Sequence, residues 1–168
     1  MKKIIMFLAC GLFIGNVALA QAPKFGWINS SELLASMPEK VKADTTLAQY
    51  ARSFQDELES MGKEYQSKMQ QYQSQQKTMT DAMREVKEKE ITDLQNRIET
   101  TQQSAESKVQ QKKQEVYAPI LDRADKALKD VAKDKGYDYI LDVAQGAVLY
   151  EKEGDDILPF VKAKLGIK

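Results

Sequence analysis

A narrow stripe of apolar and aromatic side chains runs through the otherwise polar central half of the chain. Most neighbouring members are three or four residues apart, and a few are seven apart, as on one face of an α-helix. The first part of the stripe is Leu47, Tyr50, Phe54, Leu58, Met61, Tyr65, Met69, Tyr72, Met79, Met83 and Val86. The second part is Ile91, Leu94, Ile98, Ala105, Val109, Val116 and Ile120. Several members are eleven residues apart, which keeps the stripe on one side of a nearly straight helix.

Residues 39–118 contain no proline and only one glycine, so nothing in their composition opposes long helices. A single helix of that length would leave its stripe without a partner, whereas a chain that folds back supplies one. Thr78 or Thr80 can cap a second helix, with Asp81 near its positive N-terminus. We therefore predict that residues 44–116 form an antiparallel two-helix coiled-coil hairpin with its tip near residues 78–84.

The segment before the hairpin predicts a short strand at residues 25–29, "FGWIN", followed by a helical turn that Ser30 or Ser31 caps. Pro38 suits the first position of the next helix, where its missing N–H costs nothing. After the hairpin, Pro119 to Lys135 has one apolar face and predicts an amphipathic helix.

The C-terminal region predicts two strands and a last helix. Gly136 suits the end of the preceding helix, and residues 137–144, "YDYILDVA", read as a strand. Gln145–Gly146 predicts a tight reversal into a further strand at residues 147–152. The last helix is expected to open at Gly154–Asp156, with Ile157, Val161 and Leu165 on one apolar face.

Residues 21–43 and 117–168 thus predict a small base of three strands and two or three helices. The fold class is α+β and predominantly helical. So small a base has a limited core, and apolar residues lie on both faces of its central strand, so we expect the base to self-associate. The candidate residues for this contact are Phe25, Trp27, Ile28, Tyr139, Ile140, Leu141, Val143, Val148 and Tyr150.

Residues 1–20 have the pattern of a secretory signal peptide. Two lysines precede an apolar run over residues 4–14, and the small residues Ala18 and Ala20 precede the expected cleavage site. An alternative is a lipoprotein signal in which Cys10 carries the lipid. Cleavage after Ala20 removes the only cysteine, so the remaining chain forms no disulfide.

Composition excludes several kinds of chemistry. The chain has no histidine, which rules out histidine triads and histidine metal sites. Without the leader's two lysines, the chain has 23 basic and 25 acidic residues, and this balance argues against a nucleic-acid partner. No phosphate loop or glycine-rich dinucleotide turn occurs. The charge run at residues 85–90 and the carboxylates of Asp138 and Asp142 read as surface groups, so we expect no enzyme activity, cofactor or metal.

Methionine and tyrosine side chains in the stripe allow two interpretations. They fill a narrow two-helix interface, or they contact many different apolar sequences, which suits flexible and amphipathic side chains. Both can hold, since two helices cannot cover a whole side chain. The candidate contact residues are Met61, Tyr65, Met69, Tyr72, Met79 and Met83.

These elements, in this order, resemble the Skp/OmpH family of periplasmic chaperones. The resemblance covers the chain after the leader and rests on "KFGWINSSELLASMPE", the long polar hairpin, "APILDRADKALKDVAKDKGYDYILD", "AVLY" and "DDILPFVKAKLG". It implies a homotrimer in the periplasm, with a β-rich body and three hairpins around a cavity. It also implies ATP-independent binding of unfolded outer-membrane proteins.

One departure from the family concerns charge. The best-known relatives are strongly basic, whereas this chain is near neutral after the leader. No residue is therefore assigned to lipopolysaccharide or phospholipid, and peripheral membrane contact stays open as a further interaction. The alternative function is a periplasmic coiled-coil scaffold or adaptor that docks one specific partner.

Overall fold

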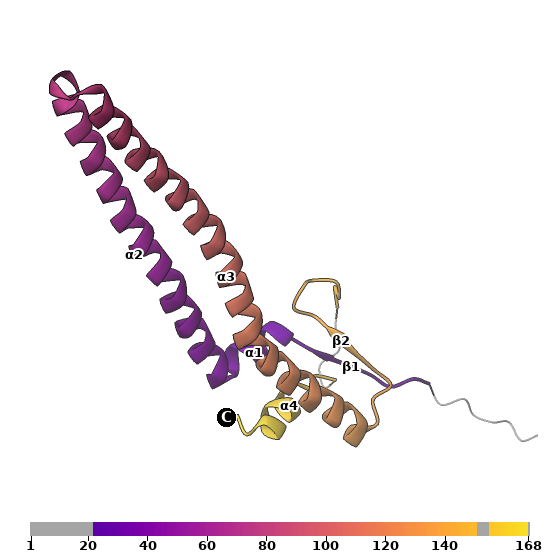
Figure 1. The fold of residues 1–168 in the computed structure, drawn as a ribbon. Coiled ribbons are helices and arrows are strands. Elements are labelled where there is room, and N and C mark those ends of the chain that lie inside the picture. Colours follow the sequence, from indigo (N-terminus) through magenta and orange to yellow (C-terminus); the bar gives the residue numbers. More distant parts are fainter. Residues whose placement is uncertain (1–21, 151–154, 168) are drawn as a thin grey trace, which may run out of the picture.

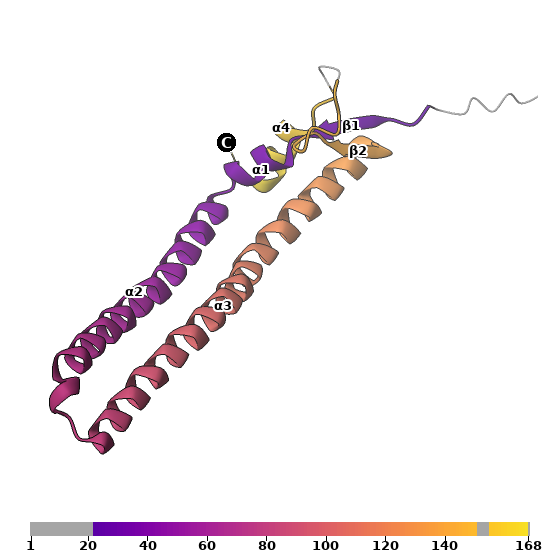
Figure 2. The same ribbon diagram turned by 90° about the horizontal axis from the view of Figure 1, so that it is seen from above.

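The structure, a computed structural model, describes residues 22–150 and 155–167; the predicted leader lies outside them. Two long helices lie side by side and project from a small base (Figures 1 and 2). The elements in order are β1 (Phe25–Ile28), α1 (Ser30–Ser36), α2 (Pro38–Gln75), the 3₁₀ turn η1 (Gln76–Thr78), α3 (Asp81–Lys135), β2 (Tyr139–Asp142) and α4 (Leu158–Leu165). The predicted class, a helical hairpin on a small β-containing base, is confirmed.

Prolines mark the root of the hairpin in two different ways. Pro38 occupies the start of α2, as predicted. Pro119, however, lies inside α3, so the expected separate helix from that residue is wrong and α3 runs unbroken from the tip into the base. Proline denies the carbonyl of Glu115 its usual helical partner. The helix continues because Val116 and Ile120, on either side of the proline, pack against the core of the base.

The cap of α1 is Asn29 and not one of the two serines that follow it. The Asn29 side chain accepts a hydrogen bond from the backbone N–H of Glu32 at 3.0 Å. The Ser30 hydroxyl is already engaged, because it donates to the Asp142 carboxylate at 2.6 Å. The serine cap is therefore wrong, since a contact with a strand distant in sequence takes that hydroxyl.

At the tip, the chain reverses within residues 76–80, slightly earlier than the predicted range 78–84. Thr80 caps α3 by accepting a hydrogen bond from the N–H of Met83 at 3.3 Å, and Asp81 lies in the first turn. These are two of the features that the sequence predicts for the start of the second arm. The carboxylate of Asp81 suits the positive end of the helix.

Replacing Thr80 by alanine should destabilise the first turn of α3 by about 1 kcal/mol, because the N–H of Met83 loses its acceptor. Hydrogen exchange at the Met83 amide should then accelerate about fivefold. Thr78→Ala is the matched control, because its hydroxyl donates to the Gln75 carbonyl at 2.9 Å and caps no helix. Equal exchange rates in the two variants would contradict the assigned cap.

Among the described residues, the sheet of the base has two parallel strands, β1 and β2, and the whole hairpin connects them. Phe25 pairs with Tyr139 and Ile28 with Asp142. The other edge of β1 is also occupied, because the backbone N–H of Trp27 donates a hydrogen bond to the Asp155 carbonyl at 3.0 Å. Strand β1 is thus central, and it ties both ends of the chain together.

The predicted third strand is absent from residues 147–150, and its remaining residues lie outside the described part. Gly146 does form the expected turn, with its N–H donating to the Val143 carbonyl at 3.2 Å. The turn does not return the chain along β2, and the side chain of Leu149 is 96% exposed. An extended segment gains no hydrogen bonds without a partner strand, so it does not become a strand in this single chain.

Helix α4 buries the predicted face, Ile157, Val161 and Leu165, although it begins later than expected. The sheet packs closely onto this core. At Gly26, a Cβ atom would lie 2.9 Å from the ring of Tyr137, so a side chain there would displace the ring. The end of α3 follows prediction, with Gly136 in the left-handed conformation as its cap.

Candidate functional site

The predicted stripe forms the contact between α2 and α3. A two-helix seam covers only one side of each side chain, so many stripe residues remain half-exposed. Met83 and Val86 lie outside the seam and are exposed. Within residues 44–116 the buried apolar residues are Met61, Met79, Ile91, Leu94 and Ala105.

The six candidate contact residues divide between the two interpretations of the stripe. Met61 and Met79 are buried, so they act as seam residues in this structure. Met83 is 53% exposed beside the tip and is available for contact. The other three, Tyr65, Met69 and Tyr72, are half-buried and keep part of their surface open to solvent.

Polar contacts also join the outer parts of the two arms. The Lys68 ammonium lies 3.2 Å from Glu90, and the Tyr72 hydroxyl donates to Glu88. Hydrogen bonds from Lys87 and then Lys68 lower the pKa of Glu90, so this carboxylate stays charged between its partners. The sequence predicts a fully solvated charge run here, whereas two of its glutamates contact the other arm.

A second polar cluster joins the arms at the root. Asp44 accepts hydrogen bonds from Lys40, at 2.7 Å, and from the hydroxyl of Tyr117 on α3. The Lys40 contact, followed by the Tyr117 contact, lowers the pKa of Asp44. Nearby, Arg123 pairs with Glu39 on α2. Bonds of this kind fix the spacing of the arms where they enter the base.

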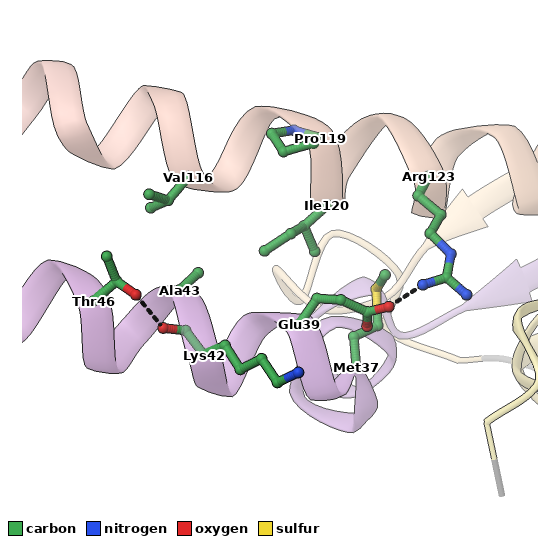
Figure 3. A pocket seen from close by; sticks show the side chains of 9 residues that line it. All are labelled: Met37, Glu39, Lys42, Ala43, Thr46, Val116, Pro119, Ile120 and Arg123. Carbon is green, nitrogen blue, oxygen red and sulfur yellow. Dashed lines mark hydrogen bonds and ion pairs between the residues drawn. The ribbon is translucent and has the colours of Figure 1, made fainter.

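Between these root contacts lies a cleft of about 410 Å³, here called the root cleft (Figure 3). The side chains of Ala43, Val116 and Ile120 point into it from the two helices. Sequence reasoning missed this feature. Its only signal is the small side chain of Ala43 one turn before Leu47, a place where the stripe would otherwise carry a large residue. The residues that line the cleft are Met37, Glu39, Lys42, Ala43, Thr46, Val116, Pro119, Ile120 and Arg123.

The base presents a second apolar surface, the outer sheet face, formed by Phe25, Trp27, Tyr139 and Leu141. The rings of Phe25 and Tyr139 stack with their centroids 5.1 Å apart, and both are exposed. Leu141 is 43% exposed. Side chains alternate along a strand, so the neighbouring residues point the other way, into the core.

The remaining self-association candidates occupy different environments. Ile28 is fully buried in the core, on the opposite side of the sheet from the outer sheet face. Ile140, Val143 and Val148 are half-buried. Tyr150 is exposed, as is its neighbour Leu149, which is not among the predicted contact residues.

Within residues 22–150 and 155–167, no group of three or more acidic side chains is placed to hold a metal ion. The two strand carboxylates have structural partners instead. Asp138 accepts from the backbone N–H of Lys24 at 2.6 Å, and Asp142 accepts from Ser30 and from the N–H of Ala144. In the same part of the chain, no helix has the length and apolar character needed to cross a membrane.

These features define a structural class, in which a long helical hairpin projects from a small base and both parts expose apolar side chains. Residues 24–165 match the family described as outer membrane protein (OmpH-like). The chain therefore belongs to the OmpH-like family, as the sequence resemblance predicts.

Individual relatives agree with this assignment. The chain is 29% identical to "Chaperone protein Skp" of Yersinia enterocolitica over 157 residues, which is 94% of each protein. It is 30% identical to the protein of the same name from Pectobacterium atrosepticum over 158 residues, again with 94% of each chain covered.

Among solved structures, an outer membrane chaperone described as OmpH-like, from Caulobacter crescentus, has a TM-score of 0.74. It shares 16% sequence identity, and the match covers 92% of this chain and 90% of that one. At this identity the likeness shows the fold.

Proposed function

We propose that this protein is an ATP-independent holdase chaperone that binds unfolded outer-membrane proteins and prevents their aggregation. The observation that carries the proposal is a long hairpin whose methionine and tyrosine side chains stay partly open to solvent, in a chain of the OmpH-like family. The names of its chaperone relatives support it. Met83 and the half-buried Tyr65, Met69 and Tyr72 are the proposed contacts, with Met61 and Met79 reached when the arms separate.

The proposed assembly is a homotrimer in which residues 21–43 and 117–168 form the body and residues 44–116 form the projecting hairpins. The outer sheet face supports self-association, since exposed stacked aromatic rings favour burial against another copy. Three hairpins would then surround one client. Confinement raises the effective concentration of many weak contacts, so the client is retained and still leaves without ATP.

The proposed location is the periplasm, reached through the signal peptide of residues 1–20. Family membership supports this location. Under this proposal, clients bound for the outer membrane cross that compartment unfolded, and the holdase acts on them there.

The test dilutes a urea-denatured outer-membrane β-barrel protein into buffer with the chain of residues 21–168 and follows light scattering. A few-fold molar excess of trimer should suppress most of the scattering, with or without ATP. Scattering that rises as fast as without the protein would refute the holdase.

Two matched variants sharpen this test. Met83→Ser removes an exposed apolar side chain from α3 and should weaken the suppression of aggregation. Glu85→Ser, at an exposed position on the same helix, should not weaken it.

A scaffold or adaptor would behave differently, because it would bind one folded partner saturably and ignore unrelated unfolded barrels.

A further inference from the structure

We propose that the root cleft is an anchoring site for one tyrosine or tryptophan side chain of an unfolded client. The proposal rests on the proposed function, because it names a defined site within the otherwise diffuse contact of a holdase. Three features of the cleft favour such an occupant: its shape, its charged rim and one carboxylate in its wall.

The floor of the cleft is apolar and preformed. Met37, Ala43 and Ile120 are buried beneath it, and Val116 closes one side (Figure 3). A volume of about 410 Å³ falls within the range of small-ligand pockets, roughly 300–1,000 Å³. An apolar side chain that enters this space removes apolar surface from water on both partners, which favours binding.

The rim favours an aromatic occupant over an aliphatic one. Lys42 on α2 and Arg123 on α3 both line the cleft, and within the described residues Lys42 has no ion pair. Cations are attracted to the face of an aromatic ring, whereas an aliphatic side chain offers them nothing. The protein already uses this contact, since the ammonium of Lys135 lies 3.5 Å from the ring centroid of Phe160.

Glu39 favours aromatic rings that carry a hydrogen-bond donor. One of its oxygens pairs with Arg123, and the other is buried with no hydrogen-bond partner in the described part of the chain. If the Glu39 side chain rotates toward the cleft, this oxygen can accept a hydrogen bond from a tyrosine O–H or an indole N–H. Tyrosine and tryptophan are enriched in the aromatic girdles of membrane β-barrels, so the site suits the proposed clients.

The probe is N-acetyl-tyrosine amide, compared with N-acetyl-leucine amide, in NMR titrations of the chain of residues 21–168. The methyl signals of Met37, Val116 and Ile120 should shift with the tyrosine compound, with a Kd on the order of 1 mM. The leucine compound should bind about fivefold more weakly. Lys42→Gln should reduce that preference about twofold.

A pair of adjacent threonines gives a matched control. Both are exposed on α2, and each hydroxyl donates to the carbonyl four residues earlier, at 2.9 Å. Only Thr46 lines the cleft, so Thr46→Trp should fill it and abolish the shifts while Thr45→Trp leaves them intact.

Three results would overturn the proposal: unmoved signals, equal affinity for the leucine compound, or equal loss in both tryptophan variants. A lower oligomer mass in Thr46→Trp alone would also overturn it, by assigning the cleft to a second copy of this chain. The scattering assay separates this failure from that of the holdase, because a protein that suppresses aggregation yet ignores the amide loses only the anchoring site.

Discussion

Replacing Leu141 by glutamate is expected to dissociate the proposed homotrimer. Leu141 is 43% exposed in the single chain, so one copy accommodates the carboxylate, whereas a self-association contact over the outer sheet face would bury it. A buried, unpaired charge costs several kcal/mol, which corresponds to a dissociation constant raised about 100-fold or more. Light scattering across a concentration series should show the mass falling toward 1 chain at concentrations where the parent stays associated.

Val86→Glu is the control for this experiment. It adds the same charge at a side chain that is 56% exposed on the hairpin, away from the sheet, and should leave the mass unchanged. Far-ultraviolet circular dichroism should show helical spectra for both variants. A Leu141→Glu protein that keeps the parent mass at every concentration would remove the outer sheet face from the proposed assembly.

Replacing Met37 by alanine is expected to cost about 3 kcal/mol of unfolding free energy. Its side chain is fully buried where α1 ends and α2 begins, so truncation leaves a cavity between the hairpin and the base. Urea unfolding followed by circular dichroism measures the loss. The protein concentration must be the same for both proteins, because the proposed self-association would contribute to the apparent stability.

Met83→Ala is the matched change for comparison. It removes the same atoms from an exposed position on α3 and should alter the unfolding free energy by less than about 0.5 kcal/mol. Equal losses for the two methionines would mean that the base core does not set the stability of the protein. Met83→Ala should still weaken the suppression of aggregation, which separates contact from stability at this position.

The association and core predictions concern the two sides of one small sheet. The inner side covers the core that contains Ile28 and Met37, and the outer side carries the exposed aromatic pair. A base with so small a core in one copy would gain stability from the proposed contact with a second copy.

The hairpin is the part of this protein that the sequence determined by itself. Helices form from neighbours in the chain, so the three-and-four spacing of the stripe and the lack of proline over residues 39–118 were enough to predict both arms. Thr80 and Gly136 likewise act on the backbone beside them, and both caps appear as predicted. The same locality explains the buried face of α4.

Only the tertiary structure decided the features that depend on residues far apart in the chain. Packing of the side chains beside Pro119 keeps α3 continuous, although local rules favour a break there. The Asp142 carboxylate engages the hydroxyl of Ser30, so Asn29 is the cap. The same holds for the parallel pairing of β1 with β2 and for the root cleft. Both form between segments that the whole hairpin separates in sequence, and a local sequence pattern does not predict contacts of that kind.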